Sequence, residues 1–233
     1  MKKFLFITMM TWAMSAQSFS LWDLIWSSNT LNKPNFDEIT NATQRKNAFF
    51  AYLLPLVEKE NNKIRLTRSL IQNNQLNDTQ RQKLAKKYRI QTISKNALLE
   101  AIDAIPPSLV LAQAAIESNW GRSRFSKRYN NYFGLWCFKP GCGVVPKKRR
   151  VGAEHEVMNF SSVGKSIEYY LLNLNRNYAY KLLRQIRTHK RKHNLKLTGG
   201  SLAEGLDKYS AIGYEYIELV QSIIRQNNLS KFD

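Results

Sequence analysis

The segment that most constrains the fold is "PPSLVLAQAAIES", which ends at Ser118 and contains almost only small and apolar residues. Two prolines suit a helix entrance, because the first turn has no use for the N–H groups that prolines lack. The residues after them predict a helix with apolar side chains on every side, which is stable only when other elements surround it. The chain must therefore fold around this helix, in which Glu117 is the one ionisable group.

Further helices are predicted on both sides of this segment. Residues 43–73 carry an apolar band at helical spacing, and residues 77–79 form an N-cap signal before a short basic helix. Ser162 is expected to cap the next helix, and another is expected over residues 181–196, ended by Thr198-Gly199-Gly200. Two more helices follow, so the predicted class is mainly α, of the α+β type, with a helical core.

A small β lobe is predicted between the central helix and Ser162. Aromatic and β-branched residues, turn signals and the alternation of Glu154, Glu156, Met158 and Phe160 favour a β-hairpin. By the period of two, Glu154 and Glu156 would share one strand face. The alternative is that both glutamates only neutralise the neighbouring arginines.

The N-terminal residues 1–20 have the order of a secretory signal peptide. Two lysines precede an apolar run, and small residues follow it, with cleavage expected after Ser18 or Ser20. The run is too short for an ordinary membrane span, and an uncleaved anchor is the alternative. Export places the protein in an oxidising compartment, with no membrane span left in the mature chain.

The rest of the chain divides into three parts by composition. Residues 21–40 show no sustained periodicity and are interpreted as a linker. Residues 41–95 form a helical segment too small for a core of its own, so it is expected to pack on the main domain, residues 96–233. The formal charge of +19 indicates a polyanionic partner, and export argues against nucleic acid.

Two cysteines, Cys137 and Cys142, stand in "CFKPGC". Two thiols cannot build a structural zinc site, and an oxidising compartment favours a disulfide. Residues 139–142 fit a type II turn, with proline second and glycine third, which would bring the sulfurs together. Closing so short a loop contributes about 2 kcal/mol, so the bridge is expected to pin the hairpin locally.

No metal or other cofactor is expected. His189 and His193 stand one helical turn apart, as a metal pair would, but the cations of "HKRKH" oppose a divalent ion and no third ligand is evident. The same cations, with those of "KKRR" at residues 147–150, would hold an anionic wall polymer or form a solvated face.

Glu117 is the candidate for catalysis. Burial in an apolar pocket raises the pKa of a carboxylic acid, and a protonated acid is what glycosidic bond cleavage requires. Trp120 follows Glu117 closely, and "YNNYFGLW" combines aromatic rings with amides, as sugar sites do. The candidate substrate-binding residues are Trp120, Asn131, Phe133, Gly134 and Trp136. The alternatives are a solvated acid at a helix end and aromatics of an ordinary core.

The stretch "PPSLVLAQAAIESNWGRSRFSKRYNNYFGLW" resembles the bacterial glucosaminidase family of peptidoglycan hydrolases. Its pattern is a helix ending in A-x-x-E-S-x-W-G, followed by a short basic helix and N-x-F-G. Further segments, such as "WCFKPGCGVVP" and "NLNRNYAYKLLR", look closest to the Bax-type members of Gram-negative bacteria. The likeness runs from about residue 41 to the C-terminus.

The resemblance implies a lysozyme-like fold in which the β lobe flanks a cleft. It implies a glycan hydrolase that needs no cofactor and acts on the β-1,4 bond after N-acetylglucosamine in peptidoglycan. Together with the signal peptide this predicts a periplasmic enzyme, and we expect a monomer. Glu117 matches the catalytic acid of the family. Tyr180 matches a tyrosine that could orient water or stabilise the transition state, with an ordinary core tyrosine as the alternative. A second carboxylate would come from the β lobe, where Glu156 is favoured over Glu154. A lytic transglycosylase, a non-catalytic murein-binding scaffold and a basic membrane-active protein remain as alternatives.

Overall fold

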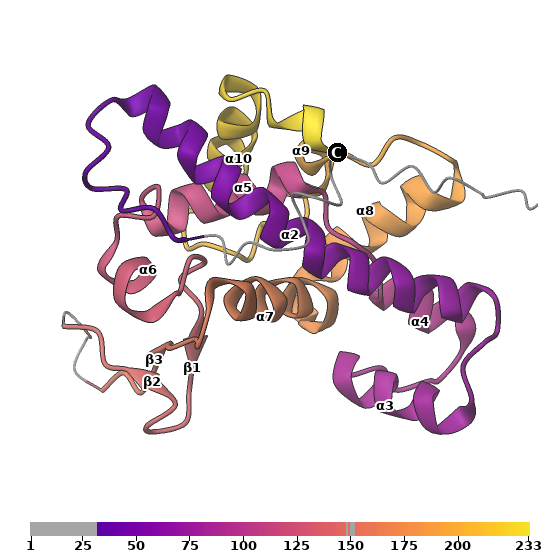
Figure 1. Cartoon of the computed structure of the whole chain (residues 1–233). Helices are drawn as coiled ribbons and strands as arrows, with labels where there is room; N and C mark the ends of the chain where they lie inside the picture. Colours follow the sequence, from indigo (N-terminus) through magenta and orange to yellow (C-terminus); the bar gives the residue numbers. More distant parts are fainter. Residues whose placement is uncertain (1–31, 148, 150–151) are drawn as a thin grey trace, which may run out of the picture. The chain divides into compact units, whose positions relative to one another are not determined.

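The structure is a computed structural model that describes residues 32–147, 149 and 152–233. Residues 34–233 form one compact unit (Figure 1). The predicted signal peptide and most of the predicted linker lie outside the described residues. In the part that is described, no helix is both long and apolar enough to cross a membrane.

The described chain is mainly helical with a small sheet, which confirms the predicted class. Its elements are α2 (Ala42–Gln72), α3 (Asp78–Tyr88), α4 (Lys95–Ala101), α5 (Pro107–Ser118), α6 (Arg124–Tyr129), β1 (Trp136–Cys137), β2 (Gly143–Val144), β3 (Glu156–Met158), α7 (Val163–Arg176), η1 (Tyr178–Tyr180), α8 (Lys181–Lys192), α9 (Gly199–Ala203), α10 (Tyr214–Gln226) and η2 (Leu229–Phe232).

Helix α5 is the central element, as its all-round apolar surface predicts. It begins at Pro107, and every residue from Pro107 to Ala115 is buried. Helices α2, α9 and α10 and the short helix η2 all contact it. A helix surrounded in this way holds its last turn rigidly, and that turn carries Glu117.

Helix α2 packs along the same core. Phe49, Leu53 and Val57 belong to the buried cluster that contains the apolar residues of α5. Toward its other end α2 joins α3 and α4 in a second, smaller cluster. Phe36, from the segment interpreted as a linker, is only 2% exposed and its ring lies 5.6 Å from that of Phe49. The last residues of the predicted linker are therefore part of the compact unit, because an aromatic side chain anchors them.

The β lobe is a three-stranded antiparallel sheet in the order β1-β3-β2. The predicted β-hairpin lobe is confirmed, since the consecutive strands β2 and β3 pair antiparallel, and β1 adds a third strand on the other side of β3. The predicted type II turn is confirmed: the Cys142 N–H donates to the Lys139 carbonyl at 3.1 Å, and Gly141 has φ +77°. The predicted strand face shared by Glu154 and Glu156 is wrong, because β3 begins at Glu156 and Glu154 is exposed before it.

Two details of the C-terminal half differ from the sequence prediction. Residues 198–200 do not only end a helix: Thr198 caps α9, which begins at Gly199. A Cβ at Gly199 would lie 2.1 Å from the Ser108 hydroxyl, so glycine permits the close packing of α9 on α5. Part of the positive charge of the basic helix α8 is buried or paired. Arg187 is 1% exposed, and Arg191 forms an ion pair with Asp103 at 3.0 Å.

Candidate active site

Glu117 lies in the last turn of α5, where the helix meets α10. The chain leaves α5 through left-handed conformations at Asn119 and Trp120, which end the helix directly after the acid. The Tyr216 hydroxyl, from α10, donates a hydrogen bond to Glu117 Oε1 at 2.7 Å. One oxygen of the half-buried carboxyl group is thus held by the protein.

The Tyr216 hydroxyl is itself held by a series of hydrogen bonds between buried polar side chains. Gln113, one helical turn before Glu117, donates from Nε2 to the Tyr216 hydroxyl at 3.0 Å. The Tyr170 hydroxyl, from α7, donates in turn to Gln113 Oε1. An ionised Glu117 can only accept, so Tyr216 must donate to it, and the orientation of Gln113 follows. Three helices therefore fix the direction of the hydroxyl that meets Glu117.

The surroundings of Glu117 favour its protonated form. Burial raises the pKa of Glu117, and the hydrogen bond from Tyr216 opposes that shift without cancelling it. Burial, followed by the charge of Glu117, raises the pKa of Tyr216 far above its usual range. Tyr216 is thus a neutral donor at any working pH, and Glu117 is an acid that holds its proton at a higher pH than an exposed glutamate does.

The loop that follows α6 brings Gly134 to the second oxygen of Glu117. Gly134 is exposed and has φ +61°, and a Cβ built on it would lie 3.2 Å from Glu117 Oε2. Below it, Phe133 is buried and stacks on Tyr170 with ring centroids 4.0 Å apart. The Tyr209 hydroxyl donates to the Phe133 carbonyl at 3.0 Å. Because Gly134 has no side chain, no Cβ crowds this oxygen of the acid.

The buried side chain of Asn131 holds the same loop by hydrogen bonds. Its Nδ2 donates to the carbonyls of Leu135 and Met158 at 2.9 and 3.0 Å, and its Oδ1 accepts from the Leu135 N–H at 3.0 Å. The residue is 1% exposed. In this structure its amide joins the loop to β3, which positions Gly134.

The two tryptophans proposed for sugar binding have different settings. Trp120 is half-buried and meets Phe49 and Phe50 of α2 edge to face, with centroids 5.6 and 5.5 Å away. Trp136 is 53% exposed and stacks on His155 at 4.1 Å. Trp136 therefore presents a large apolar surface to solvent, whereas Trp120 helps to fix the exit of α5.

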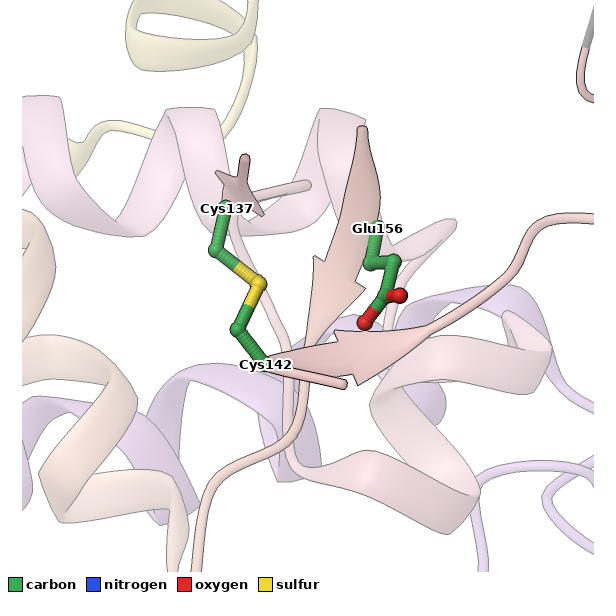
Figure 2. A group of neighbouring side chains, drawn as sticks. All are labelled: Cys137, Cys142 and Glu156. Atoms are coloured by element: carbon green, nitrogen blue, oxygen red, sulfur yellow. A yellow bond between two sulfur atoms is a disulfide. The ribbon is translucent and has the colours of Figure 1, made fainter. Parts of the chain in front are cut away.

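Glu156 lies beside the disulfide turn (Figure 2). The predicted Cys137–Cys142 bridge is present. Glu156 Oε1 accepts from the Gly141 N–H at 2.9 Å, and Oε2 accepts from the Gly143 N–H at 2.7 Å. These backbone donors lower the pKa of Glu156, so it stays ionised. Its observed contacts are with the turn, and its catalytic role stays a prediction.

Tyr180 is buried at the start of α8, and its ring lies 5.9 Å from that of Tyr209. Burial raises the pKa of Tyr180 to about 12, with a hydrogen bond to Asn173 acting in the opposite direction and the charge of Glu117 adding to the rise. Tyr180 is thus a neutral hydroxyl within electrostatic reach of Glu117.

Several residues of this site were missed in the sequence. Tyr216, Tyr209 and Tyr170 come from helices far from Glu117 along the chain, where tyrosines look like ordinary core residues. Gln113 carried a usable signal: it is the one amide in an apolar helix, four residues before Glu117 and so on the same face.

A metal site finds little support among the described residues. The one cluster of potential ligands found there is Cys137, Cys142 and Glu156. The two sulfurs are bonded to each other and cannot act as thiolate ligands. His189 and His193 are neighbours, with ring centroids 4.2 Å apart, and they form no part of such a cluster.

Comparison with known proteins adds the following relatives. Residues 95–229 match the family model Glucosaminidase, described as mannosyl-glycoprotein endo-β-N-acetylglucosaminidase. Protein bax of Escherichia coli (strain K12) is 30% identical over 214 residues, covering 86% of this chain and 76% of that protein. Exo-glucosaminidase LytG of Bacillus subtilis (strain 168) is 25% identical over 137 residues, covering 54% of this chain and 46% of LytG. The catalytic domain of the autolysin Auto from Listeria monocytogenes matches with a TM-score of 0.48 and 20% identity, over 92% of this chain and 98% of that one.

Proposed function

Because the chain belongs to the glucosaminidase family, we propose that it cleaves the β-1,4 glycosidic bond after N-acetylglucosamine in peptidoglycan, with Glu117 as the general acid. The setting of Glu117 carries the proposal. Glu117 has a raised pKa, one oxygen held by Tyr216 and the other beside the exposed Gly134. A glycosidase needs such a protonated carboxyl group with one accessible oxygen.

The contacts of Glu117 favour one of its two oxygens as the proton donor. Oε1 accepts the Tyr216 hydroxyl, so Oε2, on the side of Gly134, would carry the acidic proton. The glycosidic oxygen would approach from that side and take the proton as its bond to the sugar breaks. Tyr216 would then stabilise the carboxylate that is left, since its donor is already in place.

Tyr180 is proposed to assist as a neutral hydroxyl. Its raised pKa of about 12 keeps its proton in place through the neutral range. Such a group can orient a water molecule or donate a hydrogen bond to the sugar. It cannot replace a carboxylate as a base at neutral pH.

The contacts of Glu156 favour a mechanism with Glu117 as the sole catalytic carboxylate. Both Glu156 oxygens already accept backbone hydrogen bonds from the disulfide turn. We therefore propose that Glu156 acts through the shape of the lobe, and that water or the acetamido group of the substrate completes the reaction. The same observation keeps a lytic transglycosylase as the second candidate, since that reaction also uses a single acid.

The exposed face of Trp136 is proposed to stack on a sugar ring, and Gly134 to line the path to Glu117. Phe133, Asn131 and Trp120 would support this surface from beneath. We place the protein in the periplasm, acting without a cofactor, in agreement with the signal peptide predicted for residues 1–20.

Digestion of purified sacculi tests the proposal. The wild-type protein should release fragments with reducing N-acetylglucosamine ends, measured by mass spectrometry, and E117Q should release almost none. Anhydro-muramic ends would assign the transglycosylase reaction instead. Binding to sacculi with no release by the wild-type protein would support a non-catalytic scaffold and overturn the proposal.

A further inference from the structure

A second feature of the molecule is a pocket of about 550 Å³ lined by residues of the β lobe, of α7 and of the end of α3. The disulfide forms part of its wall. Three cationic and three aromatic side chains dominate the lining: Arg89, Lys139, Arg176, Trp136, Phe138 and Tyr169. Of the aromatics, Trp136 and Phe138 are 53% and 69% exposed.

The charge of this pocket is uncompensated. No acidic side chain lines it, and the ion pairs found between described residues include none of its three cations. The larger pocket beside α8 differs, because Asp103 there pairs with Arg68 and Arg191. Unpaired cations that share a concave wall attract a carboxylate or another anion.

Arg176 is the cation of this pocket that contacts an aromatic ring. Its guanidinium carbon lies 5.5 Å from the centre of the Tyr169 ring. Stacking of this kind restricts a long side chain and leaves the edge of the guanidinium free for two parallel hydrogen bonds to a carboxylate. The pocket thus combines a positioned guanidinium, which can donate hydrogen bonds to an anion, with exposed apolar rings.

The pocket adjoins the candidate active site. Leu135, in its wall, follows Gly134, which lies against Glu117 Oε2. Asn173, also in the wall, lowers the pKa of Tyr180, which the charge of Glu117 raises. A polymer bound across Glu117 would therefore have its neighbouring substituents within reach of the pocket.

We propose that this pocket binds carboxylates of the stem peptide attached to the glycan, so that the protein prefers peptide-bearing glycan to neutralised or stripped glycan. This inference rests on the proposed function. The sugar rings of peptidoglycan are mostly neutral, and its carboxylates are concentrated on the peptides. The cations would bind those carboxylates, and the exposed rings of Trp136 and Phe138 would pack on the adjoining sugar and aliphatic peptide surface.

Three forms of one solubilised glycan test the inference. The first carries intact stem peptides, the second carries the same peptides with their carboxylates converted to amides, and the third has its peptides removed by an amidase. The readout is kcat/KM from released reducing ends. For the wild-type protein we expect the intact form to exceed the amidated form by about tenfold, the size of one charge-assisted hydrogen bond.

Substitutions then locate the preference. R176Q should lower the ratio of intact to amidated activity toward one, R176K should restore part of it, and K139Q should lower it further when combined with R176Q. R225Q is the matched control, because Arg225 is an exposed cation in the last turn of α10 and does not line the pocket. It should leave the ratio and the activity unchanged.

The outcomes separate this inference from the proposed function. Equal activity of the wild-type protein on intact and amidated glycan, or an unchanged ratio in R176Q, would overturn the inference while the hydrolase stands. If the glycan without peptides is cleaved with the same kcat/KM as the intact form, the pocket would recognise the lactyl carboxylate that the amidase frees on the sugar. That result would overturn the stem-peptide inference. Absence of release from all three forms would instead refute the proposed hydrolase.

Discussion

The hydroxyl of Tyr216 donates to Glu117 Oε1 at 2.7 Å, although 99 positions separate the two residues in the chain. This contact and the burial of Glu117 act on its pKa in opposite directions, with burial the larger. Tyr216 therefore has two expected effects: it limits the rise of the pKa, and it stabilises the carboxylate once the proton has left.

Replacing Tyr216 by phenylalanine should move the pH profile. Loss of the donor raises the pKa of Glu117 further, so the acid stays protonated to a higher pH. The alkaline limb of kcat/KM, which reports the free enzyme, should shift upward. The maximum rate should fall about 10- to 100-fold, because the developing carboxylate loses a hydrogen bond.

Y214F is the control for this experiment. Tyr214 lies on the same helix but is 71% exposed. Its replacement should change neither the alkaline limb of the kcat/KM profile nor the maximum rate. A lower rate in Y216F with an unmoved alkaline limb would assign Tyr216 a purely structural role.

Replacing Glu117 by glutamine should remove most activity while raising stability at neutral pH. The folded-state pKa of Glu117 is raised, so the stability it contributes is complete below its unfolded-state pKa and is lost as the pH rises through the folded-state value. Glutamine has the shape of the protonated acid and never ionises. E117Q should therefore melt at a higher temperature than the wild-type protein at pH 7, and the difference should close below about pH 4. A difference that grows toward acid pH would contradict this assignment of the pKa.

Replacing Gly134 by alanine should lower activity more than it lowers stability. The new methyl group would lie 3.2 Å from Glu117 Oε2 and narrow the path to the acid. Gly213 provides a matched control, because it also has a positive φ, +52°, with no atom within 4 Å of its would-be Cβ. Both variants should lose stability, because an L residue is strained at a positive φ, and G134A alone should lose activity at least about tenfold. Equal activity of the two variants would show that Gly134 serves only the turn.

Much of the fold was predictable because its signals are local. The apolar surface of α5, the Asn77 and Ser162 caps and the type II turn before Cys142 each depend on neighbouring residues in the chain. The position of Glu117 at the end of a buried helix followed from the same local pattern.

The remaining features depend on contacts between distant segments. Helical periodicity indicates that α10 is buried on one face, but it does not say which helix that face meets, so the Tyr216 contact could not be predicted. The same holds for the strand order, since the hairpin pattern does not indicate a third strand, and here β3 lies between β1 and β2. The alternation around Glu156 predicted a strand, but the amides that bind its carboxylate lie 13 and 15 positions earlier.

Glu156 and the Cys137–Cys142 bridge together hold the disulfide turn. Glutamine at position 156 would place an NH2 group against the N–H of Gly141 or Gly143, so one backbone donor would lose its acceptor. We expect E156Q and the C137S/C142S variant to lower activity by similar factors, with faster amide exchange at residues 141–143 in both. Because they act on one turn, the combined variant should be only slightly worse than either, as a double-mutant cycle would measure. If E156Q alone lowers kcat by about two orders of magnitude, while C137S/C142S has little effect and the turn amides stay protected, Glu156 takes part directly in the reaction.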